Sequence, residues 1–176
     1  MMKTKFNWLK LLFILTLVGQ DGWAENVTVN IQGRVLASPC VVDTAVQSVD
    51  FGKMSALDLQ QAGSYSPAIK NFRITVKDCP ESTTSVTAQF SGLPYPDDNS
   101  GYGSTGSAQN IGIKVIPANS VWSDNSLSPV DGRWIKGVSS LTHSADFDFL
   151  ARVYSTTGNA TSGSISGAML VTFIYD

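Results

Sequence analysis

The sequence predicts an all-β protein built as an antiparallel β-sandwich. Segments in which apolar and polar residues alternate, the pattern of half-buried strands, occur about seven times along the chain. Turn-forming residues separate these segments, and almost no stretch has helical periodicity. Several short strands with turns between them are typical of two antiparallel sheets packed face to face.

Residues 1–24 have the features of a signal peptide. Three lysines precede an apolar run at residues 11–18, which is too short to span a bilayer. Small residues at Gly22 and Ala24 match the two positions that a signal peptidase recognises. We therefore predict cleavage after Ala24 and an exported mature chain, residues 25–176, without a membrane span.

The mature chain would have 152 residues, which suits one domain with a single core. Cleavage removes three lysines and Asp21, so nine Lys and Arg remain against thirteen Asp and Glu, a formal charge of −4. There is no basic patch, so we do not expect nucleic acid as a partner.

Cys40 and Cys79 are the only cysteines, and both lie in the exported part. An even pair in an oxidising compartment favours a disulfide between them. A metal site is the less favoured alternative, because two thiols and one histidine make a poor ligand set.

The first strand signal lies at residues 26–36, where Val27, Val29, Ile31 and Val35 share one face. Gly33 falls on the same apolar face, where a glycine indicates that another surface comes very close. Both cysteines follow this segment, so their disulfide would leave it untethered. The pattern leaves two interpretations open: the first strand of this sheet, or an extension that completes another subunit.

The following elements are predicted in chain order. Residues 55–63 are expected to form one helical turn or a short helix that ends at Gly63. Pro80 is expected to end the strand before it. Residues 93–109 and 117–132 are rich in turn-forming residues and are predicted as surface loops. The predicted strands are residues 41–42, 48–52, 72–79, 85–92, 110–116, 147–154 and 163–176.

The last of these is the longest strand signal in the chain. Its apolar face carries Ile165, Met169, Val171, Phe173 and Tyr175, and the signal continues to the final residue.

No combination of residues predicts catalysis or a cofactor. His143 lies next to Ser144 and Asp146, but the nucleophile-elbow pattern is absent, so we interpret it as a loop or strand-edge histidine. Asp97, Asp98 and Asn99 lack the spacing and the distal glutamate of an EF-hand. Trp122 and Trp134 are candidates for a sugar platform, and we favour packing under the long loops instead. We expect no enzyme activity, no metal and no cofactor.

The chain resembles the type 1 pilin family of the chaperone–usher pathway of Gram-negative bacteria, particularly the small minor subunits near the fibre tip. The resemblance covers essentially the whole mature chain. Gly163, fourteenth from the C-terminus, and the penultimate Tyr175 match the family's C-terminal motif. The other motifs occur in order and at the family's spacing: residues 27–35, Ser38-Pro39-Cys40, residues 49–53, residues 72–80 and residues 108–113.

The resemblance implies an immunoglobulin-like sandwich, residues 37–176, that lacks its final strand and is completed by donor-strand exchange. A periplasmic chaperone would fill the open groove first, and a neighbouring pilin subunit's arm would replace it at the outer-membrane usher. Residues 25–36 would form the donor arm, with Val27, Val29, Ile31, Gly33 and Val35 entering the neighbour. Gly163, Met169, Val171, Phe173, Tyr175 and Asp176 would form the groove and chaperone-binding strand, with the Asp176 carboxylate held by basic chaperone residues.

The resemblance therefore implies a non-enzymatic minor or adaptor pilin, exported through the periplasm to a surface fimbrium and supporting cell adhesion. The alternatives are a secreted carbohydrate-binding β-sandwich and a major shaft pilin of the same family. A two-domain adhesin is disfavoured, because a second domain would need a longer chain.

Overall fold

The computed structural model describes residue 32, residues 39–122 and residues 126–176. The chain divides into two units, residues 1–34 and residues 35–176, and the fold below is that of the second unit. The predicted signal peptide and all of the donor arm except Gln32 lie outside the described residues, and so does the predicted boundary at residue 37.

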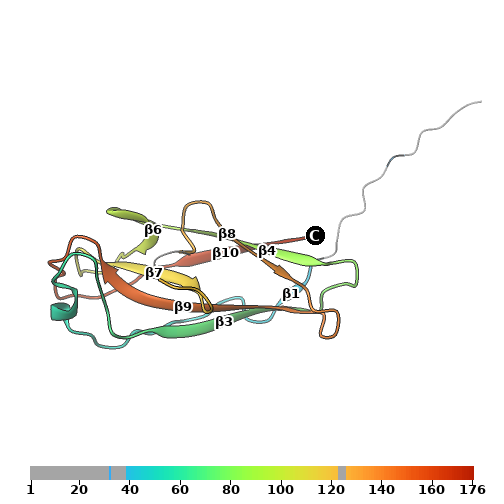
Figure 1. Cartoon of the computed structure of the whole chain (residues 1–176), viewed down its shortest axis with the longest axis horizontal. Helices are drawn as coiled ribbons and strands as arrows, with labels where there is room; N and C mark the ends of the chain where they lie inside the picture. Colours follow the sequence, from blue (N-terminus) through green and yellow to red (C-terminus); the bar gives the residue numbers. More distant parts are fainter. Residues whose placement is uncertain (1–31, 33–38, 123–125) are drawn as a thin grey trace, which may run out of the picture. The chain divides into compact units, whose positions relative to one another are not determined.

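The described part of the second unit is an antiparallel β-sandwich of two sheets (Figure 1). In the larger sheet the strands follow the order β1-β3-β9-β7-β6-β5, and β2 also pairs with β9. Their bounds are β1 Val41–Val42, β2 Ser64–Tyr65, β3 Lys70–Lys77, β5 Pro94–Tyr95, β6 Asp98–Gly103, β7 Gly112–Pro117 and β9 Ala145–Ser155. The smaller sheet has the order β10-β4-β8, with β4 Ser85–Gly92, β8 Gly132–Gly137 and β10 Met169–Tyr175.

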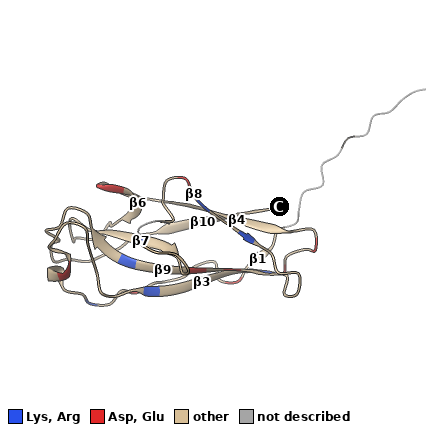
Figure 2. Cartoon of the chain, viewed as in Figure 1, with Lys and Arg blue, Asp and Glu red and all other residues tan. Residues whose placement is uncertain are grey.

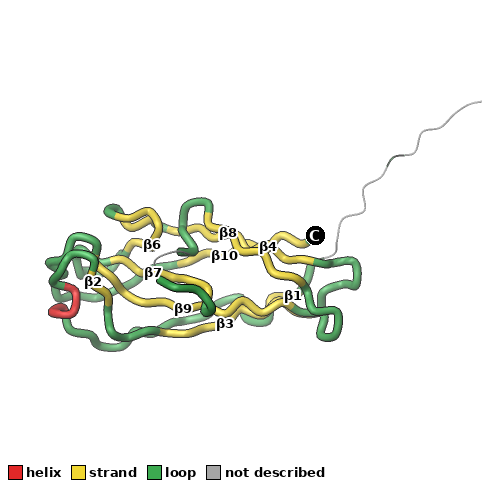
Figure 3. Tube along the Cα trace, viewed as in Figure 1, coloured by secondary structure: helices red, strands yellow, loops and turns green. Residues whose placement is uncertain are grey.

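A single 3₁₀ turn, η1 (Ala56–Leu59), interrupts the strands and loops of the described ranges (Figure 3). The Ser55 hydroxyl caps it by accepting a hydrogen bond from the Leu57 amide at 3.2 Å. Gly63, which follows the turn, has a φ of +76°, a conformation that favours glycine. The predicted helical turn is therefore present, although it is shorter than the predicted stretch.

The core lies between the two sheets and is rich in aromatic rings. Phe147 and Phe149 point inward from β9 and are 0 % exposed. Phe72 stacks on Phe149 with ring centroids 4.7 Å apart, and Trp134 meets Phe147 edge to face at 5.2 Å. These contacts join β3 and β9 of the larger sheet to β8 of the smaller one.

The structure confirms the antiparallel sandwich and the Cys40–Cys79 disulfide. The period-two segments at residues 72–79, 85–92 and 147–154 form β3, β4 and β9, and their apolar side chains face inward as predicted.

Several predicted boundaries are wrong. Residues 48–52 are not a strand, and residues 93–109 contain β5 and β6 rather than one long loop. The prediction missed β8, and β9 rather than the C-terminal stretch is the longest strand of the described chain. The C-terminal strand begins only at Met169, because Ser164 and Ser166 in the stretch before it bond to residues 104–108 instead.

Candidate functional site

The candidate site is the free edge of β10. This strand pairs with β4 along its whole length, from Met169 opposite Gly92 to Tyr175 opposite Val86. Within the described ranges no strand pairs with its other edge. An edge strand leaves alternate backbone amide and carbonyl groups available for another strand. The strand has no charged residue (Figure 2).

The inward side chains of β10 are only half-buried. Met169, Val171, Phe173 and Tyr175 pack against the core cluster but keep part of their surface accessible. The centroid of the Phe173 ring lies 5.4 Å from that of Phe147, so its inner side contacts the core directly. A complete sandwich would cover these apolar side chains on both sides.

An apolar groove of about 740 Å³ runs along this edge. One wall is β10 together with residues 165–168, and the opposite wall is formed by residues from 42 to 51, including Phe51. The floor comes from the larger sheet and consists of Phe72, Ile74, Tyr102, Ile113, Val115 and Ala151.

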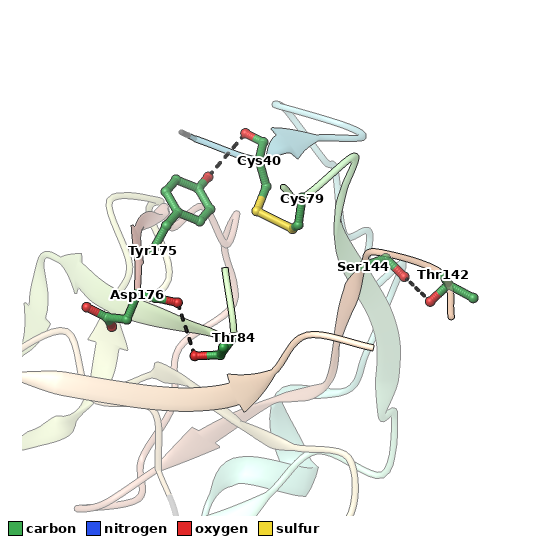
Figure 4. The surroundings of a disulfide bond; sticks show 7 residues. All are labelled: Cys40, Cys79, Thr84, Thr142, Ser144, Tyr175 and Asp176. Atoms are coloured by element: carbon green, nitrogen blue, oxygen red, sulfur yellow. Dashed lines mark hydrogen bonds between the residues drawn. A yellow bond between two sulfur atoms is a disulfide. The ribbon is translucent and has the colours of Figure 1, made fainter. Parts of the chain in front are cut away.

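The disulfide lies at the C-terminal end of β10 (Figure 4). It joins the start of β1 to the residues after β3, and the Tyr175 hydroxyl donates a hydrogen bond to the Cys40 carbonyl at 3.5 Å. Burial raises the pKa of Tyr175, so its hydroxyl keeps the proton that this bond requires. Cys40 is thereby held beside the end of the groove strand.

Asp176 extends the pairing of β10 by one residue. Its amide donates to the Ser85 carbonyl at 3.0 Å, and its carbonyl accepts from the amides of Thr84 and Ser85. The Thr84 hydroxyl also reaches this carbonyl at 3.4 Å (Figure 4). The side chain of Asp176 is exposed.

Gly163, a residue of the predicted set, is not among the residues that line this groove. It precedes β10 and packs against the backbone of residues 107–108, where an added Cβ would lie 2.4 Å from the Ala108 nitrogen. Two serines form a reciprocal pair at this crossing: the Ser107 amide donates to the Ser164 hydroxyl, and the Ser164 amide to the Ser107 hydroxyl. Glycine is thus required here because two backbone segments touch.

Of the other predicted residues, Met169, Val171 and Phe173 line the groove, and Tyr175 packs at its C-terminal end. Sequence reasoning missed the opposite wall and the floor residue Tyr102. The wall residues from 42 to 47 have no regular alternation, whereas an aromatic residue within a polar stretch was a usable signal for Tyr102.

The residues around His143 do not converge. His143 lies in a turn with a φ of +48°, and its backbone bonds to Ser139 and Cys79. The Ser144 hydroxyl pairs with Thr142, and Asp146 accepts a hydrogen bond from Thr75 at 2.6 Å. Each group therefore serves local structure.

The two tryptophans also have structural partners. Trp134 packs on the core phenylalanines from β8 rather than under a loop. The Arg152 guanidinium lies between the rings of Tyr65 and Trp122, 3.5 and 4.1 Å from their centroids. Both cation–π contacts fix the outer face of the larger sheet near β2.

Asp98 is bonded within the protein. Burial alone would raise the pKa of Asp98, but hydrogen bonds from Ser100 and Tyr154 and the nearby Lys114 lower the pKa below its ordinary value. In the described ranges no group of three or more His, Cys, Asp or Glu side chains could hold a metal ion. The described part of the chain also contains no helix long and apolar enough to cross a membrane.

The fold and the site define an immunoglobulin-like β-sandwich with an apolar groove beside an edge strand. The model of the fimbrial protein family matches residues 29–176, so the chain belongs to this family. It is 32 % identical to protein FimG of Escherichia coli K12 over 92 % of both chains. It is 34 % identical to the uncharacterized fimbrial-like protein YdeR of the same strain, over 93 % of this chain and 89 % of YdeR.

Solved structures support the same fold. The P pilus rod subunit PapA superposes with a TM-score of 0.64 at 18 % identity, covering 79 % of this chain and all of PapA. At this identity the likeness concerns the fold alone. The family match makes this chain a structural fimbrial protein rather than an enzyme.

Proposed function

We propose that this chain is a minor or adaptor pilin of a chaperone–usher fimbria, which polymerises by donor-strand complementation and so supports cell adhesion. The observation that carries the proposal is the open apolar groove along β10, in a chain whose N-terminal segment alternates as a donor strand should. Addition of an extended segment to a sheet edge is an established recognition mode, of which pilin complementation is a known example.

The groove and the arm are matched in length and chemistry. Five inward positions, from Val27 to Val35, span about 26–27 Å at roughly 3.3 Å per residue, and the groove wall from Ile165 to Phe173 has the same number of residues. Burying the four branched side chains of the arm gives roughly 6–12 kcal/mol before ordering costs, at about 1.5–3 kcal/mol each. New backbone hydrogen bonds to β10 add about 0.5–1.5 kcal/mol apiece.

The partners follow from the same groove. An uncovered apolar edge favours aggregation, so a periplasmic chaperone would cover it before assembly, and the outer-membrane usher would direct the exchange for a neighbouring subunit's arm. The subunit would pass through the periplasm to the surface fimbrium. We infer the minor or adaptor position from the resemblance to the small subunits near the fibre tip.

Deletion of residues 25–36 tests the donor role. The shortened subunit should still co-purify with its chaperone, because its own groove is intact, but should not be incorporated into fibres. A matched pair of point variants separates the two faces of the arm: Val29→Asp should block incorporation, and Asn30→Asp, one residue away on the polar face, should not. Fibre yield at the parent level from the deletion would contradict the proposal.

The position in the fibre has its own test. Immunogold labelling of isolated fibres should show this subunit only near one end if it is an adaptor. Labelling along the whole fibre would instead identify a major shaft pilin, the alternative within the same family.

A further inference from the structure

A second cavity, of about 610 Å³, is lined by β8, by β3 and β9 of the larger sheet and by the turn after β7. The strand β8 is the edge of the smaller sheet opposite β10. Of the residues that line this cavity, only Phe72 also lines the groove. Its volume lies within the range of roughly 300–1,000 Å³ that is usual for small-molecule sites.

One side of the cavity consists of an aromatic ring with a cation beside it. Trp134 and Lys136 are two residues apart on β8, so they share a face of the strand, and both line the cavity. The Lys136 ammonium lies 5.2 Å from the centroid of the Trp134 ring. Phe147 and Phe149 hold the indole edge to face, but Trp134 is only half-buried, so part of its surface stays available to a ligand.

The charge of Lys136 is not neutralised by any carboxylate in the described ranges. The other cation of the cavity, Arg73, is paired with Asp146 and Asp148. None of the ion pairs in the described part of the chain includes Lys136. A single uncompensated positive charge at a cavity favours a ligand that carries an anionic group.

Two exposed amides complete the polar lining: Asn71 on β3 and Asn119 in the turn after β7. This turn is fixed to β9, because the Ala118 amide donates to the Asp148 carbonyl at 2.8 Å. A carboxamide offers both hydrogen-bond donors and an acceptor. It therefore matches the hydroxyl groups of a sugar, each of which can donate and accept.

We propose that this cavity binds a carboxylated sugar, a sialic or hexuronic acid residue of a glycan. The pyranose ring lies against the accessible surface of Trp134, because the negative face of an aromatic ring attracts C–H groups. The carboxylate pairs with Lys136, and the hydroxyls bond to Asn71 and Asn119. The site goes beyond the proposed fibre role and does not depend on it, since a donor strand in the groove along β10 would not occupy this cavity.

The test is an NMR titration of the mature chain, extended after Asp176 by a short flexible linker and a second copy of residues 25–36 that can fill the groove. The probes are methyl glucuronide, a methyl sialoside and the neutral methyl glucoside, which has a hydroxymethyl group in place of the carboxylate of glucuronide. At least one acid should saturably shift the signals of the Trp134 indole and of the Asn71 and Asn119 amides, and the tighter of the two identifies the kind of glycan. Sodium acetate tests the carboxylate alone and should bind more weakly than that acid.

Lys136→Met removes the charge and keeps the apolar stem. It should weaken binding of the acid by about three- to fivefold and leave the weaker binding of the glucoside unchanged. The matched control is Arg133→Met, which removes a cation from the opposite face of the same strand and should not alter binding. If Lys136→Met does not fold, Asn119→Asp replaces it, because a carboxylate in the turn should repel the acid and spare the glucoside.

Three outcomes would overturn the proposal. The first is that neither acid binds, or that acetate binds as tightly as the acids do. The second is an unchanged affinity for the acid in Lys136→Met, or in Asn119→Asp where that variant is used. The third is an equal loss in Arg133→Met, since net charge rather than a built site would then account for binding.

Discussion

Removing the disulfide should lower stability by an amount that the chain's topology predicts. Cys40 and Cys79 are 39 residues apart and close a loop that contains β1, η1, β2 and β3. The chain-entropy model gives about 4 kcal/mol for a loop of this length at 25 °C. At about 2–4 °C per kcal/mol for a domain of this size, the Tm should fall by roughly 8–16 °C.

Removal of the disulfide should also destabilise the end of the groove. The Cys40 carbonyl accepts the Tyr175 hydroxyl, and the Cys79 amide donates to the His143 carbonyl at 2.9 Å. The bond therefore fixes the end of β10 and the turn before β9 at once. Without it, the segment that carries Cys40 keeps the two register pairs between β1 and β3, the bond from the Asp43 amide to the Thr75 carbonyl and the bond from the Tyr175 hydroxyl.

The assay is denaturant unfolding at 25 °C of the mature chain, extended after Asp176 by a short flexible linker and a second copy of residues 25–36 that can fill the groove. It is measured for this parent and for a Cys40→Ala, Cys79→Ala double variant. Alanine avoids burying a new hydroxyl group at either position. Leu57→Ala is the matched control, because this side chain lies between the two cysteines, does not line the groove and is 80 % exposed, so its effect should stay within about 0.5 kcal/mol. An unchanged free energy of unfolding in the double variant would refute the reasoning, and free thiols in the parent protein would refute the bond itself.

Two further predictions concern the core and its titration. Phe149→Ala should lower the free energy of unfolding by about 3–5 kcal/mol, because the ring is fully buried and contacts Phe72 and Trp134. Leu141→Ala, at a position that is 92 % exposed, is the control. Equal losses of stability in the two variants would contradict the packing. Burial and the hydrogen bond to Asp98 raise the pKa of Tyr154. The stability that the protonated Tyr154 contributes is therefore complete below the pKa of an exposed tyrosine, about 10, and is lost as the pH rises beyond it. Denaturation midpoints between about pH 8 and pH 11 should therefore fall less in Tyr154→Phe than in the parent, and parallel profiles would contradict this.

The strands that the sequence predicts best are those in which one face is buried and the other is exposed to solvent. In β9 the inward residues Phe147 and Phe149 alternate with Asp146 and Asp148, which bond to Arg73 or Thr75 on the outer face. In such a strand the alternation of buried and exposed positions can be seen in the residue types themselves. The position of each inward face could therefore be predicted without knowledge of its partner.

The strands β5 and β6 could not be predicted in this way. Their residues are mostly Pro, Asp, Asn, Ser and Gly, which have low strand propensity. They form strands because tertiary contacts require it: Tyr95 and Tyr102 are buried, and Gly101 lets the Tyr154 ring approach, where a Cβ would lie 2.2 Å from the hydroxyl. The strand β8 escaped prediction because its two large apolar residues, Trp134 and Ile135, are adjacent and give no alternation.

The smaller sheet has two edges, and its residues favour strand addition at β10 rather than at β8. On β8 the inward Trp134 is packed edge to face on core rings, and Arg133 and Lys136 lie on the strand beside it. Charged residues on an edge strand disfavour pairing with another chain. Along β10 there is no charge, and the inward Met169 and Phe173 keep accessible surface above a continuous apolar floor. Of these two edges, only that of β10 therefore combines incompletely buried core side chains with unpaired backbone groups. A donor strand at this edge would bury those side chains and pair with that backbone.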